Sequence, residues 1–496
     1  MSAPEDAAVS APEDATLQQI KSMHLMLRDF SQITENGLLR LLKPLPSGIT
    51  PVKLLDGEWL LDRAERLRGA DAEERLKLAL PRRQDLESSD EGRKAFMSLE
   101  ELLRLHREMS ADQELVKIGS PLPLLVVSHC WHDAPHPDPA GDNLLKLADA
   151  IQERRAVTRV DSRRRAAPEG RFAVFYDWCS LCQKDEAGNR AEDETEAFRT
   201  ALARMQLLYA HQKTIVYCLT EQPLGWTGNR YENRGWPSFE RMVTMLLKHH
   251  SHGSWQLIVD AANPERRPLP PMLPEEFDAM LDDEEQITFS NGTDKRLVSE
   301  LYHQTLTVAL GQTRTLRYAG LRWGDAEMES LVRVLPMCHA LETLNLKGSH
   351  NAYTSRSAEI LAEMLEERGN LPRLKCIGAR CGAKGEGEST RGPLLGSETL
   401  QAICKARSIK LAADVALGEE KRARGSVFPV MLRQLTSRSF RAGLGDDASA
   451  TSSSHSEHAT KQQGSVWATM QLVSLRFWRA VFGLRNDKRA VVPDAR

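Results

Sequence analysis

The sequence lacks long apolar segments. Its longest uninterrupted apolar stretches, such as residues 122–127, are much shorter than the roughly 20 residues that span a bilayer, so no transmembrane segment is expected. Residues 1–16 are acidic, with no basic stretch ahead of an apolar one, so no secretory signal is expected either. Eight cysteines are too few for a disulfide framework and fit reduced thiols. These absences predict a cytoplasmic protein.

A strong charge of either sign is also missing. The 66 Lys and Arg residues nearly balance the 69 Asp and Glu residues, which leaves a formal net charge of −3. This balance provides no overall attraction to nucleic acid, and no nucleic-acid partner is expected. A chain of 496 residues is too long for one hydrophobic core, so we expect several domains.

Changes in composition divide the chain into segments. The predicted segments are a disordered acidic arm (1–16), a helical N-terminal region (17–120), an α/β domain (121–262), a helical connection or linker (263–312), a strand–helix repeat segment (313–408), a helical extension (409–442), a disordered linker (443–465), and an amphipathic C-terminal helix with its tail (466–496).

Residues 121–262 alternate short apolar runs with amphipathic stretches of helix length. This alternation is typical of βαβ units around a parallel sheet. The expected strands are 124–127, 173–176 and 214–219, and the expected helices are 141–152, 194–211 and 238–248. Residues 154–171, rich in Arg and Ala, are expected to form an exposed insertion.

Residues 313–377 contain a short sequence repeat. The four-residue sequences that begin at Thr315, Thr343 and Arg373 each place a leucine second, with steps of 28 and 30 residues between these leucines. Helical stretches at 325–335 and 357–367 follow the first two sequences, and this period matches leucine-rich repeats. Stacked repeats bury their faces only against neighbours, so this short array is expected to lean on the preceding domain or to end in a helix near 400–404.

The C-terminal segment has an apolar stripe. From Val466 to Leu484, apolar residues recur every three or four positions, with Arg and Lys nearby. This pattern fits peripheral contact with an anionic membrane, contact with a partner protein, or docking of a terminal helix on its own chain.

Four motifs lie at or near the expected central strands and the helices between them. They are Val127-Ser128-His129-Cys130-Trp131, Asp177-Trp178-Cys179-Ser180-Leu181-Cys182-Gln183, the pair Met205 and Tyr209, and Arg234-Gly235-Trp236 with Glu240. In this order they resemble the motifs of the heterokaryon-incompatibility (HET) family, a relative of the TIR signalling fold. The resemblance covers residues 122–247 and implies a TIR-like parallel sheet flanked by helices.

The resemblance also implies a site at the carboxyl ends of the parallel strands, where open α/β sheets hold ligands. The candidate ligand-binding residues are Ser128, His129, Trp131, Asp177, Gln183, Arg234 and Trp236. In catalytic TIR domains, a glutamate four residues after a tryptophan supports cleavage of the nicotinamide–ribose bond of NAD. Glu240 has this spacing from Trp236 and is the candidate catalytic residue.

The chemistry that the resemblance implies is glycoside-like. A carboxylate stabilises an oxocarbenium-type transition state at the ribose carbon while nicotinamide leaves. NAD is then a substrate, and no bound cofactor is expected. The alternative is that Glu240 only favours a helix start after Pro237, where carboxylates suit the helix dipole.

The cysteines and histidines raise two other kinds of site. Trp178-Cys179-Ser180-Leu181-Cys182 resembles a thioredoxin active site, but residues 184–194 are too polar for the amphipathic helix that follows such a site. The histidines at 129, 132 and 136 and at 249, 250 and 252 lack the paired spacing of a zinc site, so no metal site is expected.

The resemblance implies an intracellular signalling or stress-response protein. Its repeats are expected to sense a signal or to act as a scaffold, and its partners are expected to be proteins, including its own kind. The TIR-like domain either cleaves NAD or acts only through protein contacts, because a fold does not settle function.

Overall fold

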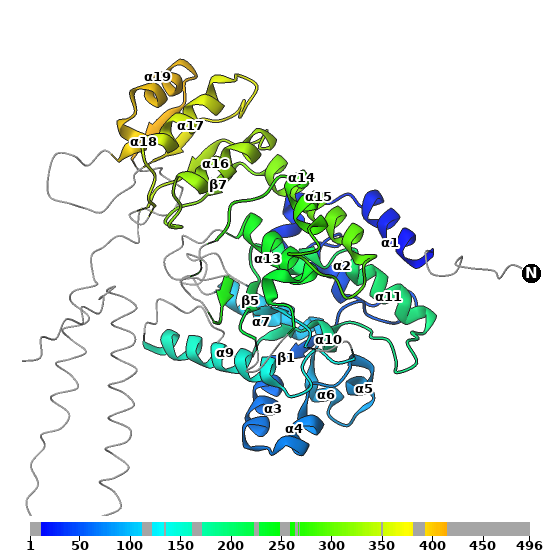
Figure 1. Cartoon of the computed structure of the whole chain (residues 1–496). Helices are drawn as coiled ribbons and strands as arrows, with labels where there is room; N and C mark the ends of the chain where they lie inside the picture. The colour runs from blue at the N-terminus through cyan, green and yellow to red at the C-terminus, as the bar shows by residue number, and fades with distance from the viewer. Residues whose placement is uncertain are drawn as a thin grey trace, which may run out of the picture. The chain divides into compact units, whose positions relative to one another are not determined.

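The computed structural model describes residues 11–111, 122–132, 135–160, 171–222, 228–248, 258–262, 266, 268–348, 351–379 and 392–413 (Figure 1). All of these residues lie within one unit, Met1–Glu420. The linker expected at 443–465 and the helix expected at 466–496 lie outside the described residues. Within the described ranges, no helix is long and apolar enough to cross a membrane.

A six-stranded mixed sheet carries the candidate site. Its strand order is β2-β1-β4-β3-β5-β6; the last four are parallel to one another, and β1 is antiparallel to both of its neighbours. The strands are β1 (Leu54–Asp56), β2 (Phe96–Met97), β3 (Leu124–His129), β4 (Ala173–Phe175), β5 (Ile215–Leu219) and β6 (Ile258–Asp260). The chain passes from β3 to β4 on one side and then to β5 on the other, so its direction of travel reverses between β3 and β5.

The central strands lie where the apolar runs predicted them. Every residue of β3, β4 and β5 is buried. Parallel strands covered on both faces are continuous apolar runs of this kind. The strands predicted at 124–127, 173–176 and 214–219 are confirmed, with small shifts at their ends.

The sheet separates two hydrophobic cores. Leu125 and Val127 of β3 pack with α3 (Gly57–Gly69) and α9 (Asp142–Val160). Leu124 and Val126 pack with α12 (Gln206–Ala210) and α13 (Gly235–Leu247). Successive residues of a strand point to opposite faces. Side chains that are neighbours in sequence at the end of β3 therefore enter different surroundings.

The region 17–120 was expected to be a helical region, and the structure shows two strands among its helices. It supplies β1 and β2, which pair with each other and join β4 at the edge of the sheet. Strands of two or three residues are too short to show a period of two in the sequence. The helices of this region are α1 (Ala11–Ser22), η1 (Leu27–Phe30), α2 (Leu38–Leu42), α3, α4 (Ala72–Leu78), α5 (Arg83–Ser88), α6 (Gly92–Ala95) and α7 (Leu99–Ala111).

Some predicted boundaries are wrong. Helix α1 begins at Ala11, inside the arm predicted to be disordered to residue 16. Helix α9 continues to Val160, so the start of the predicted insertion 154–171 is helical, while 161–170 lie outside the described residues. The helix predicted at 194–211 is two helices, α11 (Glu192–Leu202) and α12. Short helices α10 (Asp177–Ser180) and η3 (Tyr231–Asn233) complete this part.

Helix α13 carries Glu240 and begins at a glycine for a steric reason. A Cβ on Gly235 would lie 2.1 Å from the ring of Phe289, so no larger side chain fits without movement. The amide of Gly235 donates to the carbonyl of Thr288 at 3.0 Å, which ties the start of α13 to the 288–289 segment. Pro237 in the first turn costs no helical hydrogen bond.

The predicted helical connection 263–312 contains two helices. They are α14 (Pro274–Asp282) and α15 (Asp294–Gln312). Helix α15 contributes Leu301, Tyr302 and Leu306 to the same core as α13. The connection is therefore packed against the helix that carries Glu240.

A second, four-stranded parallel sheet follows, in the order β10-β9-β8-β7. Its strands are β7 (Thr315–Arg317), β8 (Thr343–Asn345), β9 (Cys376–Gly378) and β10 (Lys410–Ala412), and its helices are α16 (Asp325–Val334), η4 (Leu335–Met337), α17 (Ser355–Glu366), α18 (Pro393–Gly396) and α19 (Glu398–Ala406). Leu316 and Leu344, the buried middle residues of β7 and β8, are paired in register, as the sequence repeat predicted.

The third repeat was predicted three residues too early in the sequence. Ile377, not Leu374, aligns with Leu344. Leu374 is also buried, but it lies in the preceding turn, where its amide bonds to the carbonyl of Leu371 at 3.1 Å. The helical extension predicted from 409 is wrong where the structure describes it, because Lys410–Ala412 form β10.

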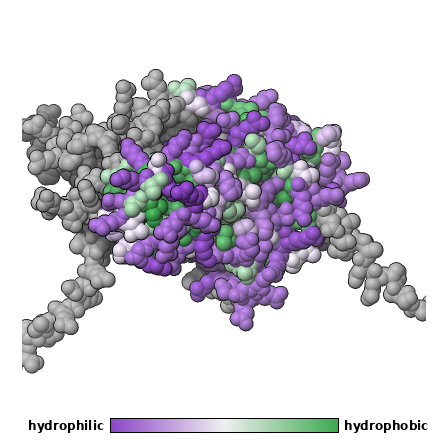
Figure 2. All heavy atoms as spheres, turned by 90° about the horizontal axis from the view of Figure 1, so that it is seen from above, coloured by the Kyte–Doolittle hydropathy of each residue, from purple (hydrophilic) through white to green (hydrophobic). Residues whose placement is uncertain are grey.

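The surface in Figure 2 is mostly hydrophilic, with apolar side chains in small separate groups. Exposed large apolar residues in the described ranges are Met26, Leu76 and Leu269, which are scattered along the sequence. Isolated apolar residues of this kind are normal on proteins.

Candidate functional site

The candidate residues lie at the carboxyl end of the parallel strands, but the sheet divides them into two groups. Ser128 and His129 are the last two residues of β3, so their side chains lie on opposite faces. Ser128 joins Glu240 on the α13 face, and His129 joins Asp177 on the α9 face.

On the α13 face, three side chains form a short hydrogen-bonded chain. The Ser128 hydroxyl donates to Glu240 Oε2 at 2.6 Å, and the Tyr231 hydroxyl lies 2.6 Å from Ser128 Oγ. Ser128 and Tyr231 are fully buried, and Glu240 is 6% exposed. Tyr209 closes this group by donating to the carbonyl of Val127 at 3.2 Å.

Glu240 is held mainly in its protonated form at neutral pH. Burial raises the pKa of Glu240 to about 8, because the charged carboxylate loses its hydration. The negative charge of Asp177 raises this pKa further, whereas the hydrogen bond from Ser128 opposes the rise. A carboxyl group tuned in this way at a strand's carboxyl edge is the kind of group that catalytic sites use.

On the α9 face, Asp177 is the centre of a partly buried polar group, with its side chain 21% exposed. Its Oδ1 lies 2.9 Å from His129 Nε2 and accepts from the Trp178 amide at 2.7 Å, and its Oδ2 accepts from Trp131 Nε1 at 2.8 Å. Burial alone would raise the pKa of Asp177, but His129, together with the hydrogen bonds from Trp131 and the Trp178 amide, lowers this pKa below its ordinary value. Burial likewise opposes a charge on His129, but Asp177 raises its pKa. The pair therefore favours an ionised state.

The Gln183 side chain holds the main chain of Asp177 in place. Its Nε2 donates to the Asp177 carbonyl at 3.1 Å. The side-chain amide of Gln84 in turn bonds to both the amide and the carbonyl of Gln183. These contacts fix the turn after β4.

Arg234 and Trp236 turn toward the 288–294 segment. Arg234 donates to Ser290 Oγ at 2.7 Å, and Trp236 Nε1 donates to Asp294 Oδ2 at 2.8 Å. Trp236 also meets Phe239 edge to face. Both Trp131 and Trp236 are half-buried. The described contacts of Trp236 thus anchor α13 to the start of α15.

Sequence reasoning missed Tyr231 and Asn143. Tyr231 lies in a single 3-10 turn, in a segment without hydrophobic periodicity. Asn143 of α9 donates to the Cys130 carbonyl at 3.3 Å and lies 3.4 Å from His129 Nδ1. The periodicity of apolar residues gives no information on a polar residue in a turn or at the start of a helix. Only a sequence motif could have identified Tyr231 and Asn143.

The cysteines of the thioredoxin-like motif are buried. Cys179 is fully buried and Cys182 is 2% exposed. Burial raises the pKa of both thiols, so each resists forming the thiolate that redox chemistry needs. Over the ranges that the structure describes, no group of three or more His, Cys, Asp or Glu residues is arranged to hold a metal ion.

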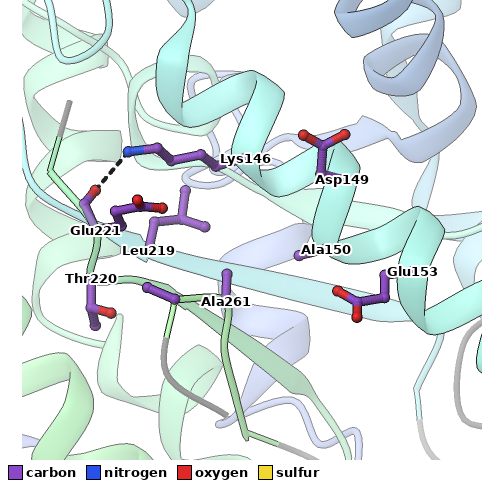
Figure 3. Close-up of a pocket in the computed structure, with 9 residues that line it drawn as sticks. Lys146, Asp149, Ala150, Glu153, Leu219, Thr220, Glu221 and Ala261 are labelled. Atoms are coloured by element: carbon purple, nitrogen blue, oxygen red, sulfur yellow. Dashed lines mark hydrogen bonds between the residues drawn. The ribbon is translucent and has the colours of Figure 1, made fainter. Parts of the chain in front are cut away.

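A cavity of about 160 Å³ lies on the α9 side, at the carboxyl ends of β5 and β6 (Figure 3). Its apolar lining includes Ala150 of α9 and, across from it, Leu219 and Ala261 at the ends of the strands. Lys146 at its rim donates to the main-chain carbonyl of Glu221 at 2.9 Å. Leu219 belongs to the core on the α9 face, so this cavity and Glu240 lie on opposite faces of the sheet.

In comparisons with known proteins, the chain matches no protein family, no curated protein and no solved structure. The interpretation of the site therefore depends on its own geometry.

Proposed function

We propose that residues 121–262 form a TIR-like domain that cleaves NAD to nicotinamide and ADP-ribose. The observation that carries this proposal is the buried Ser128–Glu240 hydrogen bond of 2.6 Å at the carboxyl edge of the sheet. The edge lies where the chain reverses between β3 and β5, and open α/β sheets bind ligands at such a switch point.

In the proposed reaction, the bond between ribose C1′ and the pyridinium nitrogen breaks, and its electron pair goes to the nitrogen. The remaining sugar carries oxocarbenium character, which the Glu240 carboxylate stabilises. Water then adds to C1′ and releases one proton, giving nicotinamide and ADP-ribose. Ser128 orients the Glu240 carboxyl group through its hydrogen bond, and the Tyr231 hydroxyl in turn holds the Ser128 hydroxyl.

We further propose that residues 313–408 are a short leucine-rich repeat segment and that the whole chain acts in intracellular signalling or stress response. The aligned buried leucines of β7 and β8 and the helices between the strands support this interpretation. In such a protein the repeats bind a partner, and the TIR-like domain responds.

A second candidate function is a scaffold that acts only through protein contacts. The observation in its favour is the enclosure of Glu240, which is 6% exposed and already engaged by Ser128. A buried carboxyl group in this state can serve packing alone.

Nicotinamide release from NAD by the purified chain distinguishes the two functions. We expect the wild-type chain to release nicotinamide and Glu240→Gln to lose about 100-fold or more of the rate, as when one electrostatic group is removed from an active site. Glu196→Gln, on an exposed residue of α11, is the matched control and should retain the rate. No release by the wild-type chain at high protein concentration would favour the scaffold.

A further inference from the structure

A larger cavity, of about 410 Å³, lies at the β2 edge of the six-stranded sheet. Its lining comes from the end of α2, residues 50–54, α5, α6, β2 and the start of α7. Cavities that bind small organic molecules commonly measure about 300–1,000 Å³. Strands β1 and β4 lie between β2 and β3, the strand that carries Ser128. The cavity is therefore separate from the candidate site, and its function does not depend on NAD cleavage.

One part of the cavity lining is apolar. Val52, Leu54 and Met97 belong to the same core as α13, and each is 6% exposed or less. Leu42 and Leu99, which pack with this core, extend the apolar lining. Because a cavity of about 150 Å³ is enough to hold a benzene molecule, this cavity has room for an apolar body of roughly ten or more carbon atoms.

The buried side chain of Arg83 fixes the main chain beside the cavity. Its guanidinium donates to the carbonyl of Pro51 at 3.2 Å and to the carbonyl of Thr50 at 2.8 Å. The amide of Val52 donates to the carbonyl of Leu41 at 2.9 Å. These contacts involve only the chain itself, so a ligand does not have to order this wall when it binds.

Another part of the lining carries a surplus of positive charge. Lys53 Nζ lies 2.8 Å from Glu87 Oε1 and 5.1 Å from the centre of the Phe96 ring. Glu87 also pairs with Arg83 at 3.0 Å, so one carboxylate faces two cations. Arg93 is exposed, lines the same cavity and, within the described ranges, makes no hydrogen bond or ion pair. Three cations and one carboxylate thus lie beside an apolar surface.

We propose that this cavity binds an amphipathic organic acid, with one carboxylate and an apolar body of roughly ten carbon atoms. The apolar body contacts Val52, Leu54 and Met97, and Arg93 binds the carboxylate with Lys53 beside it. A planar guanidinium holds a carboxylate through two parallel hydrogen bonds. An added peptide strand is the other occupant that a sheet edge attracts, but β2 has two residues and offers few main-chain groups to such a strand.

Calorimetry with decanoate and the full chain tests this site. We expect decanoate to bind, and octanoate, which is shorter by two methylene groups, to bind about tenfold more weakly. Decyltrimethylammonium has a ten-carbon chain and a positive head group, and it should bind at least tenfold more weakly than decanoate. These three probes separate recognition of the chain from recognition of the carboxylate.

Two pairs of variants locate the binding. Thr50→Trp should weaken decanoate binding at least tenfold, because the indole occupies the cavity, whereas Thr307→Trp, at an exposed residue of α15, should stay within twofold of wild type. Arg93→Gln should weaken decanoate binding at least fivefold but should not weaken binding of decyltrimethylammonium. Lys94→Gln removes the same charge at the next residue, which is exposed and lies outside the lining, and it should stay within twofold of wild type.

Denaturant unfolding shows whether each variant is folded. If Thr50→Trp does not fold, the comparison of Arg93→Gln with Lys94→Gln still decides, because both residues are exposed. The inference is wrong if the wild-type chain binds no decanoate, if it binds decyltrimethylammonium as tightly as decanoate, or if Arg93→Gln binds decanoate like wild type. These outcomes are independent of whether the chain releases nicotinamide from NAD.

Discussion

Glu240 loses its proton in different pH ranges in the folded and the unfolded chain. Burial raises the pKa of the folded group from its ordinary value of 4.5 to about 8. Between these values the folded chain holds a proton that the unfolded chain has released, so the free energy of unfolding falls as pH rises. This contribution is fully present below pH 4.5 and is lost as pH rises through about 8.

The Glu240→Gln variant removes this dependence on pH. Relative to wild type, its free energy of unfolding should rise as pH increases from about 5 to 8, by a total on the order of 3–4 kcal/mol. Urea unfolding of both proteins at several pH values measures the difference. Glu196→Gln is the control and should show no such trend. A difference between Glu240→Gln and wild type that stays constant across this range would contradict a raised pKa.

At the residue scale, the sequence predicted which residues lie at the carboxyl edge better than it predicted how they pair. Ser128 and Glu240 are 112 positions apart and meet, whereas Ser128 and His129 are adjacent and lie on opposite faces. The opposite orientation of Ser128 and His129 follows from the strand itself, because successive side chains point to opposite faces. The hydrogen bond between Ser128 and Tyr231 depends on the path of residues 228–234, which the amino-acid composition does not determine.

At the element scale, strands that are continuous apolar runs were predictable, whereas the short strands β1, β2 and β10 were not. Strands β3 and β5 contain apolar runs of four residues (124–127) and five residues (215–219), which stand out from their flanks. Strands β1, β2 and β10 have two or three residues each, so they carry no recognisable pattern. They are strands because tertiary pairing overrides local propensity.

Two neighbouring residues of β8 differ in burial, so we expect their substitutions to differ in effect. Leu344 is fully buried between β7 and β9, whereas Thr343 is half-buried. Leu344→Ala should lower the free energy of unfolding by about 2–5 kcal/mol, because it leaves a cavity. Thr343→Ala is the matched control and should change it by about 0.5 kcal/mol or less. Denaturant unfolding measures both, and equal effects would contradict the register of the second sheet.

At the scale of the whole molecule, we expect catalysis to require self-association. The candidate site offers one catalytic carboxyl group, and a neighbouring subunit would add walls that exclude water and strengthen its electrostatic effect. Because of mass action, the specific activity should rise with protein concentration. Deleting residues 466–484 should lower it if that segment joins subunits. Activity per molecule that stays constant down to a verified monomer would show that one chain holds the whole site.

The pH profile of nicotinamide release tests the central claim most directly. The claim is that the ionised carboxyl group of Glu240 acts on NAD, and kcat/KM reports the pKa of such a group in the free enzyme. From about pH 6 upward, kcat/KM should rise about tenfold per pH unit and level off near the pKa of about 8, and Glu240→Gln should lose the activity. A rate that does not change over this range, or that survives in Glu240→Gln, would contradict the account.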